Sequence, residues 1–468
     1  MAALGGEVER HLPTDATARA GDDRYPLAKA EVHGGNVLRL LLGAPILILT
    51  RPSRRGGMTE QRHDEVNVGG VPLPDYPDLH RMRRERHAKL QEQLDAQGLD
   101  GLVLLGTSAV SYATGVAAPA SDNGRASLLR SVAVVVRGEP FPFLFTPSSD
   151  GAPPDLPASY LNGPLYPDLD DGAASMASVL SFHFAAGAKL GVDEITHPMR
   201  RALNGFDLGA ASSVLGPAKL CKTPDELACI RAAQRINELA MAEVQPMLRP
   251  GVRQNELTAR FLRRVFELGA GTNGIDPIWQ AMPLTKASGP WTTHGDIAFP
   301  TASDNSFLRD GDVVWVDTGI HVEGYASDFG RTWIVGDNPR PTQSQRSQHG
   351  RWAGVVAAVL EICRPGISAL ELARAAVDAN GGTRPWIEHF YLAHGVGTDS
   401  AEMPMIGTDL GEAFDEQLVL APGMVLVIEP VIWDDGAAGY RSEDIYAITD
   451  DGWVQLSDYP YDPYGCAT

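Results

Sequence analysis

Two aspartates in the segment VVWVDTGIHVEGYASDFGRTW, residues 313–333, are the first candidates for chemistry. Asp317 follows an apolar run of four residues, and Asp328 lies eleven residues further on, in a second strand-like stretch. A buried carboxylate is costly unless it is paired, hydrogen-bonded or bound to a metal. Either both aspartates are surface acids, which is the common situation for a single aspartate in a strand, or they hold a cation.

The segment that carries both aspartates has the pattern of a β-hairpin. Its turn is expected at HVEG, residues 321–324, and a tight turn there places Asp317 opposite Asp328, with Cβ atoms about 5 Å apart. Like charges directly opposite each other are destabilising, so a bound cation is the natural remedy.

The same arrangement recurs in GMVLVIEPVIWDDGAAGYRSEDIYAIT, residues 423–449. Glu429 interrupts an apolar strand, and a loop centred on Gly436 places it opposite Glu443 in the return strand. Two hairpins with facing acids give four carboxylates in need of cations. Bridging oxygen ligands are how proteins hold two divalent ions about 3.5–4 Å apart.

A histidine supplies a fifth candidate ligand. His394 ends a short apolar stretch in YLAHGVGTDSAEMP, residues 391–404, and the glycines that follow allow the backbone to approach closely. Four carboxylates and one imidazole suit Mn²⁺, Fe²⁺, Co²⁺ or Zn²⁺ better than copper or a thiolate-bound metal. The predicted ligands of two divalent ions are Asp317, Asp328, His394, Glu429 and Glu443.

The charged neighbours of these acids allow two interpretations. Arg331 and Arg441 each lie within three residues of a candidate ligand, so each can orient a carboxylate or form an ordinary salt bridge. Asp444, by contrast, is expected to be a solvated or turn acid.

Elements that could position these residues are visible along the chain. Residues 78–98 predict an amphipathic helix that ends at Gly98, and strand-like runs follow at 99–106, 131–138 and 141–146. Strands and helices that alternate in this way indicate an α/β layer of about six strands.

A long helix over residues 222–248 marks the start of a second domain, with a boundary near 217–221. Thr223 can cap this helix, and Pro224 suits its first turn. Beyond it, helices precede and separate the two strand pairs that carry the acids. The fold class is therefore predicted to be α/β followed by α+β.

Composition and charge narrow the classes of function. The chain has 468 residues, 44% hydrophobic and 21% charged, which is enough for two domains with large cores. A formal charge of −20 argues against nucleic acid and anionic membranes as partners and suits a cytoplasmic protein. The four cysteines form no C-x-x-C pair, so neither a disulfide framework nor a zinc knuckle is expected.

The first 75 residues differ from the rest. The apolar run at 36–50 is short for a membrane span and is interrupted by Arg39 and Pro45. Met58 would make a natural start, so residues 1–57 are expected to be untranslated, disordered or a docking segment. The expected division is an extension over 1–75 and domains over 76–218 and 219–468.

These motifs resemble those of the pita-bread metallohydrolase family, which includes methionine aminopeptidase, Xaa-Pro aminopeptidase, prolidase and creatinase. The matching segments are VDTG with YASDFGRTW, HGVG, PGMVLVIEP and RSED. GLDGLVLLGTSAVSYATG and KTPDELACIRAA are similar to the creatinase-type N-terminal domain and the linker helix after it. The resemblance covers about residues 78–462. It implies a creatinase-like N-terminal α/β domain, a C-terminal pita-bread domain, a homodimer and a dipeptide or small-molecule substrate.

Two departures from the family pattern concern the substrate site. Ala401 stands where the family peptidases have the histidine of HExP, which by resemblance steadies the substrate carbonyl. The stretch 287–305 is longer than in the peptidases, so His294 cannot be matched to their upstream histidine. Both departures are similar to a divergent member that cleaves dimethylsulfoniopropionate by elimination, and Asp399 nearly matches an acid of that member, offset by one position.

The resemblance therefore implies an Xaa-Pro peptidase or creatinase type of hydrolase that cleaves a C–N bond through a metal-bridging hydroxide. Glu429 would accept the proton of the water and pass it to the leaving nitrogen. His389 and Tyr391 could replace the absent imidazole, but Asp399 and His294 are the first candidates. Two alternatives stay open: a metal-dependent lyase with Asp399 as its base, and an inactive relative that binds peptides.

Overall fold

The computed structural model describes residues 67–68, 71–72, 77–117, 130–149, 151–286, 305–460 and 462–466. Residues 1–57, which were expected to be untranslated, disordered or a docking segment, lie outside these ranges, and so does the candidate His294. Among the described residues, no helix combines the length and the apolar character that crossing a bilayer requires. A short pair of antiparallel strands, β1 (Asn67–Val68) and β2 (Val71–Pro72), precedes the first helix.

The N-terminal part is built on a six-stranded sheet, as the sequence predicted. Its strands β3 and β4 and the pair β4 and β5 are antiparallel, and the remaining neighbours are parallel. The order across the sheet is β6 (Leu161–Asn162), β5 (Phe143–Phe145), β4 (Val132–Val136), β3 (Gly101–Leu104), β7 (Lys189–Val192) and β8 (Asp207–Ala210).

Helices cover both faces of this sheet because its strands are apolar on both sides. Leu102 and Leu104 share a core with helices α1, α2 and α6, whereas Val103 shares a core with α4 and α5. Successive strand residues point to opposite faces, so two cores form. The helices are α1 (Leu79–Gln97), α2 (Thr107–Thr114), α4 (Asp170–His183), α5 (Met199–Ala202) and α6 (Ser212–Leu220).

The structure confirms the predicted end of α1 and the predicted start of α7, whereas α7 ends at Val244, before the predicted residue 248. Asp78 caps α1 by accepting a hydrogen bond from the backbone of Arg81, and Gly98 ends it in the left-handed region, with φ of 64°. Helix α7 (Pro224–Val244) begins with a capping box: Thr223 and Glu226 each accept a hydrogen bond from the other's backbone N–H.

The C-terminal part contains two main sheets that carry the candidate ligands. The first is β10 (Ile278–Met282), β11 (Val313–Thr318) and β14 (Phe329–Ile334), extended by β9 (Thr272–Asn273), β12 (Ile320–Val322) and β13 (Tyr325–Ala326). The second is β16 (Glu402–Ile406), β15 (Ala393–Gly395), β17 (Val425–Ile428), β20 (Asp444–Ile448) and β21 (Trp453–Gln455), followed by the ribbon of β18 (Val431–Asp434) and β19 (Ala438–Arg441).

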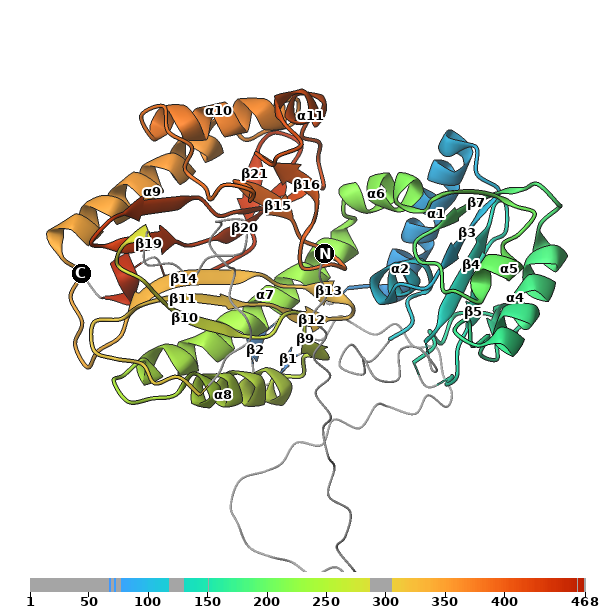
Figure 1. The fold of residues 1–468 in the computed structure, drawn as a ribbon, viewed down its shortest axis with the longest axis horizontal. Coiled ribbons are helices and arrows are strands. Elements are labelled where there is room, and N and C mark those ends of the chain that lie inside the picture. Colours follow the sequence, from blue (N-terminus) through green and yellow to red (C-terminus); the bar gives the residue numbers. More distant parts are fainter. Residues whose placement is uncertain are drawn as a thin grey trace, which may run out of the picture. The chain divides into compact units, whose positions relative to one another are not determined.

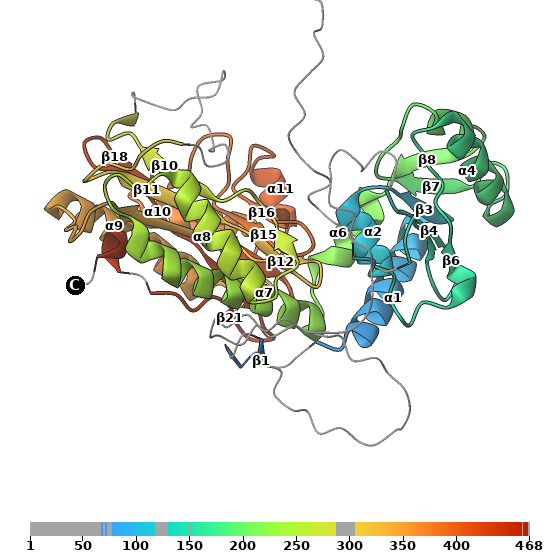
Figure 2. The ribbon, with the colours of Figure 1, turned by 90° about the horizontal axis from the view of Figure 1, so that it is seen from below.

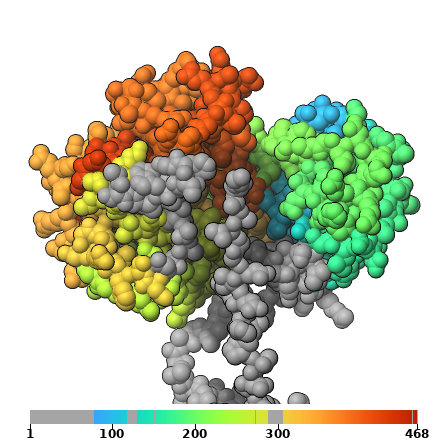
Figure 3. Space-filling view, in the orientation of Figure 1, coloured from blue at the N-terminus to red at the C-terminus, as the bar shows by residue number. Residues whose placement is uncertain are grey.

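Helices pack on the outer side of each sheet. Helices α7 and α8 lie along the first sheet, and α9 and α10 lie on the side of the second (Figures 1 and 2). In the space-filling view, segments coloured yellow to red pack against one another as one body (Figure 3). The helices after α7 are α8 (Gln254–Glu267), α9 (Gln343–Ile362), α10 (Ala369–Ala379) and α11 (Glu412–Gln417), and the short 3₁₀ turns are η1 (Ala158–Tyr160), η2 (Gln245–Met247) and η4 (Pro463–Gly465).

The side chains of strand β11 alternate between two faces of its sheet, and this alternation decides which way Asp317 points. Val314 and Val316 pack into the core of α7 and α8, whereas Val313 and Trp315 pack into the core shared with the second sheet. Asp317 continues the odd-numbered series, so its side chain faces the second sheet.

The predicted register of the first hairpin was wrong by two residues. The structure pairs Asp317 with Gly330, and the loop is the two-residue turn Glu323–Gly324 between Val322 and Tyr325. Both loop residues have positive φ, 50° and 83°, which is typical of a tight hairpin turn. Asp328 is therefore a diagonal neighbour of Asp317, at a longer separation than a direct partner.

The predicted register of the second hairpin is the one found. Ile428 pairs with Asp444 on one side of a break in the ladder, and Val431 pairs with Arg441 on the other. Both ladders share one register, which places Glu429 opposite Glu443 within the break.

Candidate metal centre

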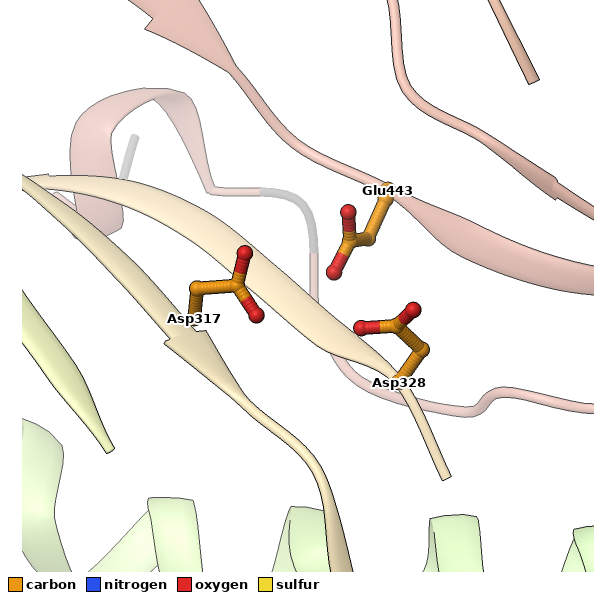
Figure 4. Close-up of side chains that lie close together, drawn as sticks. All are labelled: Asp317, Asp328 and Glu443. Carbon is orange, nitrogen blue, oxygen red and sulfur yellow. The ribbon is translucent and has the colours of Figure 1, made fainter. Parts of the chain in front are cut away.

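Three of the predicted ligands converge between the two sheets. Asp317 comes from the end of β11, Asp328 directly precedes β14, and Glu443 directly precedes β20. One carboxylate oxygen of each lies within 4.8 Å of the others, and all three side chains are buried. Figure 4 shows the three carboxylates turned toward one another from three separate segments of the chain.

His394 and Glu429 extend this cluster. Nε2 of His394 lies 3.3 Å from Oδ2 of Asp328 and 3.2 Å from Oε1 of Glu429. Nδ1 of His394 lies 2.9 Å from the carbonyl oxygen of Gly395, which can accept its hydrogen and leave Nε2 facing the acids. All five predicted ligands are therefore brought into one buried cluster.

Arg441 supplies a positive charge to the same cluster. Its Nη2 lies 3.0 Å from Oδ2 of Asp317, 2.6 Å from Oε2 of Glu429 and 2.5 Å from Oε2 of Glu443. One guanidinium thus holds three of the four carboxylates in place, and four acids facing one arginine leave an excess of negative charge.

The side chain of Arg331 pairs with Asp444 rather than with a proposed ligand, and the prediction that Asp444 is a solvated or turn acid was wrong. Its Nη2 pairs with Oδ1 of Asp444 at 3.1 Å, and Asp444 is 1% exposed rather than solvated. The reason is that Asp444 is part of β20, whose flanks are covered by β17 and β21.

Burial and mutual repulsion shift the pKa values of these groups. Burial raises the pKa of Asp317 to about 7, against the opposing charge of Arg441, and the neighbouring Asp328 adds to the rise. Burial also raises the pKa of Glu443. In His394, burial opposes the charged form, but the carboxylates of Asp328 and Glu429 raise its pKa to about 10. The cluster thus attracts positive charge strongly.

Two carboxylate oxygens show that the cluster suits a cation. Oδ1 of Asp317 and Oε1 of Glu443 are buried and have no hydrogen-bond donor among the described residues. A buried acceptor without a partner costs free energy. Hard oxygen ligands beside an imidazole are a donor set that first-row divalent metals accept, so the residues fit such ions.

The candidate catalytic residue Asp399 lies apart from the clustered acids and is held by a lysine. Its Oδ2 contacts Nζ of Lys219, on α6. Lys219 also pairs with Glu402 at 2.7 Å, and Lys222 pairs with the same glutamate at 2.8 Å. The sequence alone does not reveal these two lysines, because they precede their acidic partners by about 180 residues and no local spacing connects them.

Two other candidates for the missing imidazole differ in their distance from the cluster. His389 is exposed and pairs with Asp409. Tyr391 packs its ring against that of His394, with centroids 5.0 Å apart. Burial raises the pKa of Tyr391, and the charges of Glu429 and Asp328 add to this rise. Tyr391 is therefore the better placed of the two.

The backbone beside the acids is held by two further residues that were not predicted from the sequence. Gln234 and Asn237 of α7 form hydrogen bonds with Asp328 and Thr318. The available signal was two polar residues, three apart, in the stripe of α7 that is otherwise formed by Ile230, Ala233 and Met241.

Two family models match the chain. Residues 228–450 match the model described as metallopeptidase family M24, and residues 86–204 match the creatinase/prolidase N-terminal domain. Together they cover the N-terminal sheet except β8 and the two main C-terminal sheets except β21.

The relatives include a lyase and dipeptidases. Dimethylsulfoniopropionate lyase DddP of Roseobacter denitrificans is 27% identical over 416 residues, which cover 83% of this chain and 88% of the lyase. The probable dipeptidase PepE of Mycobacterium bovis is 30% identical over 257 residues, 54% of this chain and 62% of PepE. The structure of the prolidase from Pyrococcus horikoshii OT3 aligns with a TM-score of 0.62 at 22% identity, covering 81% of this chain and 99% of the prolidase.

Proposed function

Because the chain belongs to metallopeptidase family M24 and carries a creatinase/prolidase N-terminal domain, we propose that it is a dinuclear metal-dependent hydrolase. Its substrate would be a dipeptide or a small amide-like molecule, cleaved at a C–N bond. The observation that carries the proposal is the buried convergence of the five predicted ligands, with two carboxylate oxygens that lack donors among the described residues.

Charge supports two ions rather than one. The ligands would be Asp317, Asp328, His394, Glu429 and Glu443. Four carboxylates and the guanidinium of Arg441 carry three negative charges in excess. One divalent ion leaves one negative charge, whereas two leave one positive charge, which favours an anionic nucleophile or a substrate carboxylate. When bound, such ions supply a water nucleophile of lowered pKa and a Lewis acid for the substrate carbonyl.

The protein's own residues would position the substrate and move the proton. Glu429 is fixed through Oε2 by Arg441, with Nε at 2.7 Å, so its Oε1 is the oxygen that can accept a proton and return it to the leaving nitrogen. Tyr391 would donate a hydrogen bond to the developing oxyanion in place of the imidazole absent at Ala401. A carboxylate cannot make this donation while ionised, so Asp399 is less suited to hydrolysis.

Hydrolysis is tested with purified protein loaded with Mn²⁺ or Co²⁺ and a panel of Xaa-Pro and other dipeptides. We expect release of free amino acids that chelation abolishes and metal restores. A metal-loaded protein that hydrolyses no member of the panel, or one whose activity survives Glu429→Gln unchanged, would contradict the proposal.

A lyase is the second candidate, favoured by the match over 88% of the length of the dimethylsulfoniopropionate lyase and by Ala401. Asp399 would take the proton from the carbon next to the substrate carboxylate. The electron pair of that C–H bond would form a C=C bond as the C–S bond breaks, releasing dimethyl sulfide and acrylate. Lys219, in contact with Asp399, would hold the base in place.

Gas chromatography for dimethyl sulfide tests the lyase directly. The protein is incubated with dimethylsulfoniopropionate, with Asp399→Asn as the variant and metal-free protein as the control. Dimethyl sulfide that depends on Asp399 would favour the lyase, and none above the control would end it.

Several finer expectations stay predictions. They are the homodimer, the cytoplasmic location, the choice of metal, the domain boundary at 218 and 219, and the role of His294.

A further inference from the structure

The hairpin that carries Asp317 and Asp328 has a gap in its ladder at the candidate centre. The ladder of β11 and β14 ends at Thr318 and Phe329, and that of β12 and β13 begins at His321 and Ala326. Asp328 lies in this gap. Beside it, the backbone N–H of Ser327 still donates to the carbonyl oxygen of Ile320 at 2.8 Å. Asp328 itself has no strand partner among the described residues, and its backbone N–H is held by a side chain instead.

Helix α7 holds the Asp328 side of the gap through Gln234. Oε1 of Gln234 accepts a hydrogen bond from the backbone N–H of Asp328 at 3.2 Å. The amide group of Gln234 is in turn oriented by Glu238, one turn later, which accepts from Nε2 at 3.3 Å.

Asn237 connects both sides of the gap. Its Nδ2 donates to the carbonyl oxygen of Thr318 at 2.8 Å and to Oγ of Ser327 at 3.0 Å. Its Oδ1 accepts from Oγ1 of Thr318 at 2.9 Å. Ser327 completes the bridge by accepting from the backbone N–H of Ile320 at 3.1 Å. Thr318 and Ser327 are direct neighbours of Asp317 and Asp328, so the bridge spans the two ligand-bearing positions.

The burial of these amides makes the arrangement rigid. Gln234 is 1% exposed and Asn237 is 0% exposed, and their spacing of three residues places both on the same side of α7. A buried amide is costly without partners, and apolar residues would fill the same volume at lower cost. A stability role alone therefore explains these two side chains poorly.

We infer that Gln234 and Asn237 are positioning residues, an α7 bracket that sets the separation of Asp317 and Asp328 and thereby the affinity and geometry of the metal centre. This inference rests on the proposed function, since it needs metals at these ligands. Partners that orient metal ligands typically change metal affinity by 10–100-fold when they are removed.

The test compares Gln234→Met and Asn237→Leu, which keep volume but lose the hydrogen bonds. Gln348→Met is the matched control. Gln348 is also fully buried, and its Nε2 donates to the carbonyl oxygens of Ile432 and Ala438, neither of which adjoins a proposed ligand. Each protein is measured for Co²⁺ affinity by chelator competition, for the visible absorption spectrum of bound Co²⁺, and for unfolding in urea.

We expect both bracket variants to bind Co²⁺ at least tenfold more weakly and with an altered spectrum. Gln348→Met should lose stability but keep the affinity and spectrum of the wild type. Bracket variants that fold and retain both wild-type properties would overturn the inference. Should they not fold, Thr318→Val removes a single hydroxyl bond to Asn237, and an unchanged spectrum and affinity there would overturn it equally.

Failure of the inference is distinct from failure of the proposed function. If the wild type binds no Co²⁺, the metal centre itself is refuted, and both proposals fall. If the wild type binds Co²⁺ and the bracket variants bind it identically, only the bracket is refuted.

Discussion

Gly330 shows how closely the candidate centre is packed around its acids. It pairs with Asp317 across the ladder of β11 and β14. A Cβ atom at Gly330 would lie 2.7 Å from Cδ and Oε1 of Glu443 and 2.8 Å from Nη1 of Arg441. The absence of a side chain there is what allows a glutamate of the second sheet to reach an aspartate of the first.

Gly330→Ala should therefore weaken metal binding without removing any ligand. The added methyl group would push Glu443 and Arg441 away from Asp317, and we expect a loss of about tenfold or more in Co²⁺ affinity. Gly209→Ala is the control, since Gly209 also lies in a strand but a Cβ there meets only one side-chain atom, at 4.0 Å. Equal affinities in both variants would show that Glu443 is not held as proposed.

The residue at position 401 allows a complementation experiment. If Tyr391 donates to the oxyanion, Tyr391→Phe should lower kcat for dipeptide hydrolysis with little change in KM, because one oxyanion donor contributes about 2.7–4 kcal/mol to the barrier. Ala401→His in the same chain should recover part of this loss, since it restores the imidazole of the related peptidases. Steady-state kinetics of the single and double variants checks this, and an unchanged kcat in Tyr391→Phe would exclude the phenol.

At the scale of elements, helix ends were predictable because their signals are local. Thr223, Pro224 and Glu226 form the start of α7 as expected, and Gly98 ends α1. The six-stranded sheet also followed from the alternation of strands and helices. The five clustered residues could be predicted for two reasons. Each one follows or interrupts an apolar stretch, and each one lies in a motif that resembles a motif of a known family.

The register of the hairpins and the contacts between distant residues were harder to predict from the sequence. The loop between β18 and β19, residues 435–437, is centred on Gly436 as predicted, and this gave the correct register. The first hairpin turns at Glu323 and Gly324, which the local sequence does not distinguish from the preceding pair of residues. Gln234 and Asn237 resemble surface residues of an amphipathic helix. Only the folded chain shows that they face Thr318 and Asp328.

The capping box of α7 gives an element-scale prediction. Thr223→Ala removes the hydroxyl that accepts from the Glu226 backbone, and we expect the free energy of unfolding to fall by about 1 kcal/mol. Thr223→Ser keeps the hydroxyl and should behave as the wild type. Urea denaturation of the three proteins checks this. Equal stability of Thr223→Ala and the wild type would mean that the cap contributes nothing here.

At the scale of the whole molecule, the cluster couples metal binding to folding. Its ligands come from β11, β15 and the segments beside β14, β17 and β20. They lie up to 126 residues apart in the chain, from Asp317 to Glu443. An unfolded chain does not assemble these ligands, so metal binds the folded state and stabilises it. Without metal, the buried acids repel one another and destabilise both sheets.

Removal of metal should therefore lower the melting temperature of the whole unit. At a metal concentration 100 times Kd, each site stabilises the folded state by about 2.7 kcal/mol, and chelation should remove that contribution. Scanning calorimetry of metal-loaded and chelated protein measures the shift, and elemental analysis counts the ions. Asp328→Asn, which lacks one proposed ligand, should show a smaller shift in melting temperature than the wild type.

The contradicting outcome is a protein that holds less than about one equivalent of metal and melts at the same temperature with and without chelator. This result would favour an inactive relative that binds peptides, because a peptide-binding surface does not require dications to balance its buried acids.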